Sequence, residues 1–167
     1  MALGRVLGSI FCILMLGCAS LTTEAEEMPY HFAVGAGINY TGYGFSFGHQ
    51  QDHRLIAISA GLMSTDNLAG NLYGGGLSYQ RNDLWTHHFK NPENHAFGIY
   101  LGTVGNRFES FGPGGWEYSP LYGGALTYNY FFNGFSSSGF HVGAFIGYGE
   151  HKNASATPAG LQIGFRF

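Results

Sequence analysis

Histidine, serine and carboxylate side chains are the residues of this chain that could carry out metal-dependent or acid–base chemistry. The chain contains eight histidines, and His87, His88 and His95 lie close together in the sequence. Adjacent histidines on an extended chain point in opposite directions, and the sequence has no Asp/Glu–His spacing typical of a zinc site. We therefore expect these histidines to be solvated loop residues, and the sequence predicts no metal site and no cofactor.

Ester hydrolysis would need a serine nucleophile, a histidine base and an orienting carboxylate within hydrogen-bond reach. Glu150, His151 and Ser155 lie together in the sequence, but in a predicted loop, and a flexible loop rarely holds the geometry of a triad. Ser59 and His141 fall on predicted strands with no acid nearby. The sequence therefore predicts no catalytic residue, and acyl hydrolysis of lipids remains an alternative function.

The elements that would position these side chains alternate with a period of two. In the segment 159–167 the odd positions are apolar and end in Phe165 and Phe167, whereas the even positions are Gly, Gln, Gly and Arg. Such alternation predicts a strand with one face toward lipid and the other toward a polar lumen. Similar patterns predict further strands at residues 31–40, 43–49, 54–63, 70–81, 95–106, 119–132 and 139–149.

The segment 31–49 has two interpretations. A two-residue turn at Thr41-Gly42 would pair Tyr40 with Tyr43 in a hairpin, or the segment could be one long strand bent at a glycine. The hairpin gives eight strands in total, an even number as in single-chain bacterial barrels. It also places Ile38 and Tyr40 on the outer face, with Tyr40 in an aromatic girdle at the membrane surface.

Charged residues favour a membrane environment over a soluble barrel. They make up 10% of the chain, against about 25% in an ordinary soluble domain. Those after the N-terminal segment lie in connections and at strand ends, and a Lys or Arg on a lipid-facing wall costs roughly 2–4 kcal/mol at the bilayer midplane. The net charge of -3 gives no indication of a nucleic-acid partner.

The N-terminal segment, residues 1–25, has the pattern of a cleaved signal peptide. Arg5 precedes an apolar run, 6–19, that is shorter than the ~20 residues of a membrane-spanning helix. Three processing sites remain open: after Ala25, after Ala19 or Ser20, and, with lipidation, at Cys18. Both cysteines lie in this segment, so the predicted barrel domain, 26–167, has no disulfide and no thiolate-bound metal.

From residue 30 onward the chain resembles the small eight-stranded outer-membrane proteins of the OmpA/OmpX type, through its strand pattern, signal peptide and terminal Phe167. The resemblance implies an all-β fold, an eight-stranded antiparallel transmembrane up-and-down β-barrel in the bacterial outer membrane. It also implies contacts with outer-membrane lipids and lipopolysaccharide, recognition of Phe167 by the barrel-assembly machinery, and a monomer. Because this architecture serves anchors, adhesins and lipid-modifying enzymes alike, it does not select a function.

Two sets of residues are candidates for function. The first faces the predicted lumen: Asn129, His141, Gln162 and Arg166. The many glycines on the same face either leave space for an acyl chain or small ligand, or relieve crowding and ease strand curvature. The second set lies in the predicted outer loop 106–118 and could form a surface contact: Arg107, Phe108, Phe111, Trp116 and Tyr118. Its aromatic rings could instead fold back onto the barrel rim. A structural or surface-interaction role without catalysis is the function that we expect.

Overall fold

The computed structural model describes residues 29–67, 70–84, 86–110, 116–152 and 154–167. The predicted signal peptide, 1–25, lies outside the described residues. Within them, no helix has the length and apolar character needed to cross a bilayer.

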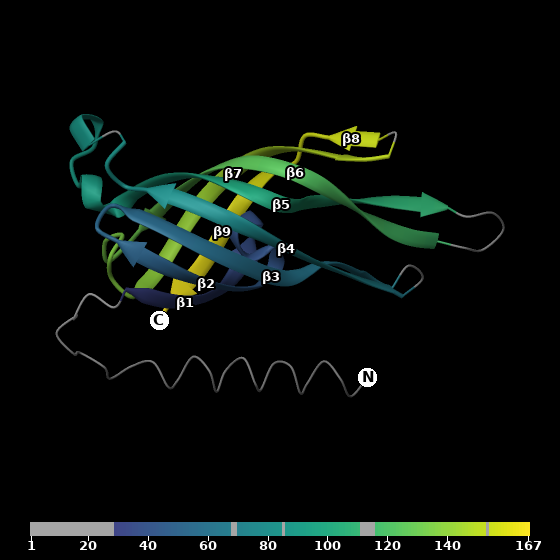
Figure 1. Cartoon of the computed structure of the whole chain (residues 1–167), viewed down its shortest axis with the longest axis horizontal. Coiled ribbons are helices and arrows are strands. Elements are labelled where there is room, and N and C mark those ends of the chain that lie inside the picture. The colour runs from purple at the N-terminus through teal and green to yellow at the C-terminus, as the bar shows by residue number, and fades with distance from the viewer. Residues whose placement is uncertain (1–28, 68–69, 85, 111–115, 153) are drawn as a thin grey trace.

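The described chain forms a closed antiparallel β-barrel (Figure 1). Its wall consists of β1 (Tyr30–Gly37), β2 (Gly42–Gln51), β3 (Arg54–Asp66), β4 (Gly70–Arg81), β5 (His95–Ser110), β6 (Trp116–Phe131), β7 (Gly139–His151) and β9 (Ala159–Arg166). Each strand pairs with its neighbours in sequence, and the β1–β9 ladder closes the circle. The short β8 (Ala154–Ala156) pairs with the C-terminal end of β7. The prediction of an all-β, eight-stranded up-and-down barrel is therefore confirmed.

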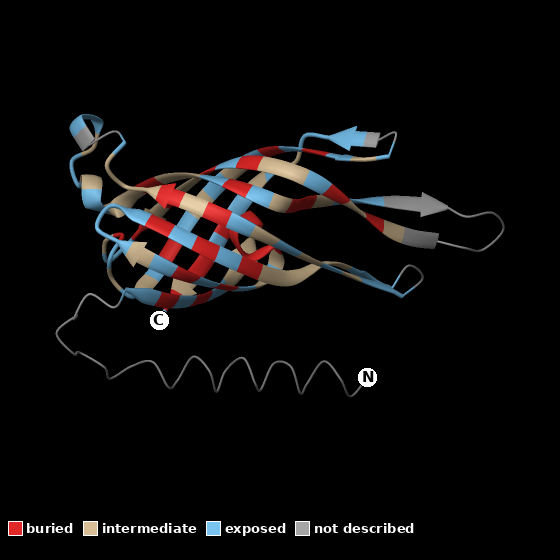
Figure 2. Cartoon of the chain, in the orientation of Figure 1, coloured by how far each residue is buried: buried red, intermediate tan, exposed pale blue. Residues whose placement is uncertain are grey.

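Side chains alternate between the two faces of the wall, as period-two patterning requires. Phe45, Ile58 and Leu161 are exposed on the outside, whereas Ser46, Ser59 and Asn129 are buried inside. The alternation of buried and exposed residues is visible along each strand (Figure 2). The wall thus has an apolar exterior and an interior that contains both polar and apolar side chains.

The segment 31–49 is a hairpin, but its turn differs from the predicted one. β1 ends at Gly37, which pairs with Gly42, and the residues between them form the 3-10 turn η1 (Ile38–Tyr40). Gly37 and Gly42 have φ angles of 124° and 89°, values open to glycine, so the chain can leave the wall there and return to it.

The prediction that Ile38 and Tyr40 lie on the outer face is wrong, because η1 folds into the lumen. Both side chains are buried, and Tyr40 belongs to no aromatic girdle. Their apolar character fitted the alternation of the preceding strand equally well. At residues 38 and 40, the same apolar alternation is compatible with an inward turn and with an outward-facing strand.

The connections also differ from expectation. The predicted outer loop 106–118 is mostly a β-hairpin, because β5 continues to Ser110 and β6 begins at Trp116. The connection at 82–94 contains two 3-10 turns, η2 (Thr86–His88) and η3 (Pro92–Asn94). At the same end of the barrel, the connection between β6 and β7 inserts Phe135, which is 1% exposed.

Candidate functional site: the lumen and a groove on the outer wall

The lumen is closed by Phe135 at the end where β1 begins and Phe167 lies. Nη1 of Arg166, on β9, donates hydrogen bonds to the carbonyl of Phe135 and to Oε1 of Gln50, the latter at 2.7 Å. The Arg166 guanidinium also lies over the rings of Phe131 and Phe135, at 4.6 and 5.4 Å from their centroids. Such cation–π contacts and the two oxygen acceptors hold the connection in the mouth of the barrel.

The middle of the lumen contains a chain of amide side chains. Nδ2 of Asn129 donates to Oε1 of Gln80 at 3.1 Å, and Nε2 of Gln162 donates to Oδ1 of Asn129 at 2.8 Å. The backbone N–H of Asn39, in η1, donates to Oε1 of Gln162 at 3.3 Å. These bonds connect β4, β6 and β9 with the inward turn, so the amides satisfy one another and fix the turn in place.

η1 is attached to the wall on its other sides as well. The Tyr40 hydroxyl and Nε2 of His141 share a hydrogen bond of 2.5 Å. Oγ1 of Thr41 lies 2.8 Å from Oγ of Ser59 and 2.9 Å from the Tyr100 hydroxyl. Thr41 has a φ of 52°, an unfavourable value for a β-branched residue, and these hydrogen bonds offset that strain.

On the side of η1 away from Phe135, the lumen contains an apolar cluster. Ile38 packs with Tyr100, Val104, Leu121 and Ala125, and Phe145 lies against this cluster. The part of the lumen between Phe135 and η1 encloses a cavity of only about 10 Å³. That space suits about one water molecule. The described side chains therefore pack this part of the lumen closely and leave no room there for an acyl chain.

The lumen glycines make space for side chains of the protein itself. A Cβ on Gly164 would overlap the Tyr40 ring, and a Cβ on Gly76 would overlap the Tyr100 ring. Of the two interpretations of the glycine-rich face, the structure favours relief of crowding.

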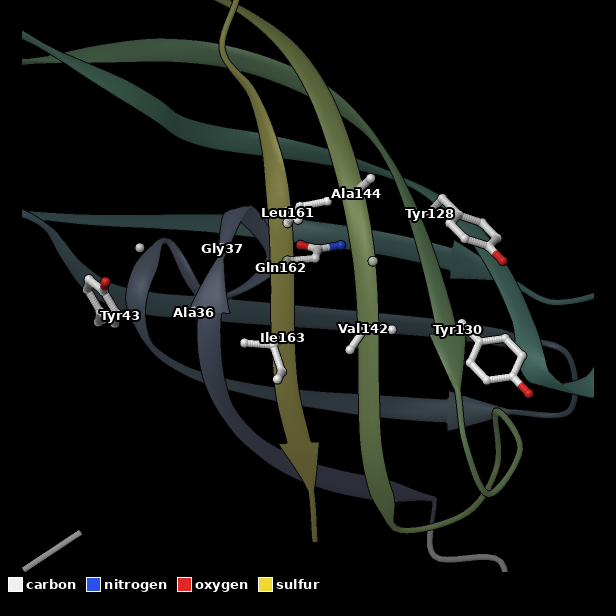
Figure 3. Close-up of a pocket in the computed structure, with 12 residues that line it drawn as sticks. Ala36, Gly37, Tyr43, Tyr128, Tyr130, Val142, Ala144, Leu161, Gln162 and Ile163 are labelled. Carbon is white, nitrogen blue, oxygen red and sulfur yellow. The ribbon is translucent and has the colours of Figure 1, made fainter.

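An open groove of about 770 Å³ lies on the outer wall, across β2, β1, β9, β7 and β6 (Figure 3). Tyr43 borders it at one end, and Tyr128 and Tyr130 border it at the other. Between them lie mainly small or aliphatic residues: Ala36, Gly37, Gly42, Val142, Gly143, Ala144, Leu161 and Ile163. Gln162, whose amide belongs to the chain of lumen amides, also lines the groove.

The groove lies where β1 leaves the wall. β1 pairs with β9 only between Ala33–Ala36 and Ile163–Arg166, whereas β7 pairs with β9 over its whole length. The first four residues of β9, 159–162, therefore have a strand partner on one side only. Leu161 is 84% exposed there.

The four polar residues predicted in the lumen all lie inside the barrel and are buried: Asn129, His141, Gln162 and Arg166. Sequence patterning did not identify Tyr40, which bonds to His141, or Phe135, whose carbonyl accepts from Arg166. It also did not identify Thr41, which bonds to Ser59 and Tyr100. The sequence signal available for the inward turn was the pair of glycines that bracket it, Gly37 and Gly42, which the structure shows at positive φ.

The predicted surface-contact residues lie on the outer part of the β5–β6 hairpin. Arg107 is exposed and pairs with Ser119 in the ladder, whereas Tyr118 is half-buried. The backbones of Phe108 and Trp116 also belong to this ladder. Phe111 lies outside the described residues, so no common surface is defined for the set.

The candidate hydrolytic residues do not form a triad. Glu150 pairs with Ser155 across the β7–β8 ladder, and its carboxylate accepts a hydrogen bond from the Tyr148 hydroxyl at 2.5 Å. In the described part of this hairpin, no hydrogen bond joins His151 to either residue. Among the described residues of the whole chain, no group of three or more His, Cys, Asp or Glu side chains could hold a metal ion.

The geometry defines a small, closed, eight-stranded antiparallel barrel whose lumen is occupied by its own side chains. The crystal structure of the N-terminal β-barrel domain of Pseudomonas aeruginosa OprF is similar to this chain, with a TM-score of 0.44 and 19% sequence identity. The match covers 83% of this chain and 96% of the OprF chain. This likeness is too distant to transfer residues or roles. No protein-family model and no curated protein sequence matches the chain.

Proposed function

We propose that this chain is an integral protein of the bacterial outer membrane with a structural or surface-interaction role and no catalytic turnover. The observation that carries the proposal is the apolar, uncharged outer wall. Large apolar residues such as Ile58 (61% exposed) and Leu126 (64%) point outward. A water-exposed wall of this kind would be unfavourable, whereas a bilayer solvates it.

The described charged side chains support a wall in lipid, because they avoid the middle of the outer wall. Arg54 and Asp66 lie at the two ends of β3, and Arg81 ends β4. Arg81 forms an ion pair of 2.5 Å with Asp83 in the following connection, and this guanidinium holds the pKa of the Asp83 carboxyl below its usual value. A band free of charge thus separates two charged rims.

Aromatic residues gather at the rim nearest the chain termini. Phe32 packs against Phe45 and Phe167, and Phe140 packs edge-on against Phe165, with ring centroids 4.8 Å apart. Aromatic girdles of this type mark the membrane interfaces of outer-membrane barrels. In this arrangement the start of β1 and Phe167 face the periplasm, and the long β3–β4 and β5–β6 hairpins project from the cell.

Membrane fractionation of cells that express the full chain tests the localisation. We expect the protein in the outer-membrane fraction, with an electrophoretic mobility that changes on heating. Recovery in the soluble periplasm without such a change would contradict the proposal. A surface role predicts that replacing 108–116 by a short Gly/Ser turn abolishes binding to a surface ligand such as lipopolysaccharide while heat-modifiability remains.

The outer-wall groove supports a second candidate function, the binding of a lipid acyl chain. Its apolar lining and its tyrosine borders fit a hydrocarbon chain that lies along the wall. Native mass spectrometry of detergent-purified protein would reveal a retained phospholipid or lipopolysaccharide. We expect Ala144→Phe, which fills the groove, to remove it, and Ala60→Phe, on β3 outside the groove, to leave it bound. Equal retention in both variants would reject the groove as the site.

A further inference from the structure

The lumen near the chain termini contains a buried cation with no carboxylate partner among the described residues. Arg166 is 4% exposed. Every described Asp and Glu side chain is exposed or lies in a connection at a barrel end. The acceptors of Nη1, Gln50 and the Phe135 carbonyl, are neutral. Burial of an uncompensated charge costs several kcal/mol, so a negative charge at this place would stabilise the barrel.

Three buried side-chain nitrogen atoms at this end of the lumen, one of them from Arg166 itself, have no hydrogen-bond partner. They are Nε of Arg166, Nδ1 of His31 and Nδ1 of His141. All three side chains are more than nine-tenths buried, and all three line the cavity of about 10 Å³. Unpartnered buried groups are rare in folded proteins, and three around one cavity indicate a missing ligand.

The hydrogen bond between Tyr40 and His141 sets the polarity of this cavity. When the Tyr40 hydroxyl donates to Nε2 of His141, the hydrogen of the imidazole lies on Nδ1. Nε of Arg166 always carries a hydrogen, and His31 can place its own on Nδ1. Oδ1 of Asn39 also lines the cavity unpartnered, and rotation of that amide by half a turn brings its N–H group to the same place.

We propose that this cavity binds a single small anion such as chloride. Its volume suits one particle about the size of a water molecule, which excludes carboxylates and phosphates. The unpartnered nitrogen atoms and the Arg166 charge favour an anion over neutral water, because charge-assisted hydrogen bonds are about twice as strong as neutral ones. The anion would neutralise the charge of Arg166 and connect β1, β7 and β9. Its binding does not depend on the proposed membrane location of the barrel.

Halide-dependent stability of the full barrel, folded in detergent micelles, tests this site. Unfolding is measured in sodium bromide and in sodium gluconate at equal ionic strength, and bromide is located in crystals by anomalous diffraction. We expect saturable stabilisation by bromide and an anomalous peak between Arg166, His31 and His141. Arg166→Gln should abolish the halide effect, whereas Arg54→Gln, at an exposed arginine on the barrel rim, should retain it.

If Arg166→Gln does not fold, His31→Gln provides the test, and it should weaken the apparent bromide affinity about tenfold or more. Stability that follows ionic strength alone, with no anomalous peak in the cavity, would overturn the proposal and leave water as the occupant. A halide effect that persists in both lumen variants would also overturn it, because the site would then lie elsewhere.

Discussion

The hydroxyl of Tyr40 lies 2.5 Å from Nε2 of His141, although 101 residues separate them in the sequence. This contact joins the turn after the first strand to β7 through the interior of the barrel. It shows that the connection between β1 and β2 is part of the lumen core.

Gly164→Ala should destabilise the barrel, because the added Cβ would overlap the Tyr40 ring and approach Cε1 of His141 to 2.8 Å. We expect a loss of about 1–3 kcal/mol in the free energy of unfolding. Urea unfolding in micelles measures it. Combination with Tyr40→Leu should recover part of the loss, whereas Gly105→Ala, with its nearest contact at 3.6 Å, should be tolerated. If the losses of unfolding free energy from the two changes simply add, Tyr40 and Gly164 are not in contact, and the explanation is contradicted.

Thr41→Val should remove the hydroxyl that lies between Ser59 and Tyr100 while it keeps the shape of the side chain. Two buried hydroxyls then lose a partner, so we expect a loss of about 1–3 kcal/mol in unfolding free energy. Thr41→Ser keeps the hydroxyl and should lose less. The same urea titration compares them, and equal effects of both variants would mean that the hydroxyl contributes nothing.

Leu161→Arg distinguishes a wall in lipid from a wall in water. Leu161 is 84% exposed, so arginine would be harmless in a soluble protein. In a bilayer we expect a penalty of up to roughly 2–4 kcal/mol, depending on depth. Reversible unfolding in lipid vesicles measures it, with Leu84→Arg in the β4–β5 connection as the control. Indifference of the barrel to both changes would argue against a lipid-facing wall at this position.

Phe167→Ala should lower the amount of folded barrel in the outer membrane of cells. Phe167 packs against Phe32 and Phe165 with centroid distances of 5.9 and 5.0 Å, and we expect the assembly machinery to recognise this terminal aromatic. Phe132→Ala, at an exposed aromatic of the same rim, serves as the control. Folding of the purified variants in micelles separates a recognition defect from lost packing. Unchanged cellular yield would count against recognition.

The purified barrel should not conduct ions at large, stable levels in planar bilayers. Phe135 closes one mouth, and η1 with the apolar cluster of Ile38 and Tyr100 fills the interior. Shortening both obstructions with Phe135→Gly and Tyr40→Ala should increase conductance. Large openings of the unmodified protein would show that the lumen is not filled in a membrane.

The alternation of residue types predicted the wall because the two faces of each strand have different surroundings. Successive residues point to opposite faces, so their types alternate with the surroundings. It predicted the inner positions of Asn129 and Gln162 for the same reason. It failed at Ile38 and Tyr40, because an apolar residue fits both an apolar outer wall and a packed lumen. The extent of β5 and β6 was underestimated, because above the register shift between Thr103 and Gly105 the alternation no longer continues in phase.

The inward position of η1 restricts the order in which the barrel can form. We expect η1 to reach the interior before the last ladder forms, because its side chains bond to strands on several sides of the lumen, β3, β5 and β7. The β1–β9 ladder joins the first and last strands of the wall and contains only four residue pairs, from Ala33–Arg166 to Ala36–Ile163. We therefore expect this short seam to close last, around an already seated Tyr40, and to be where the completed barrel opens first.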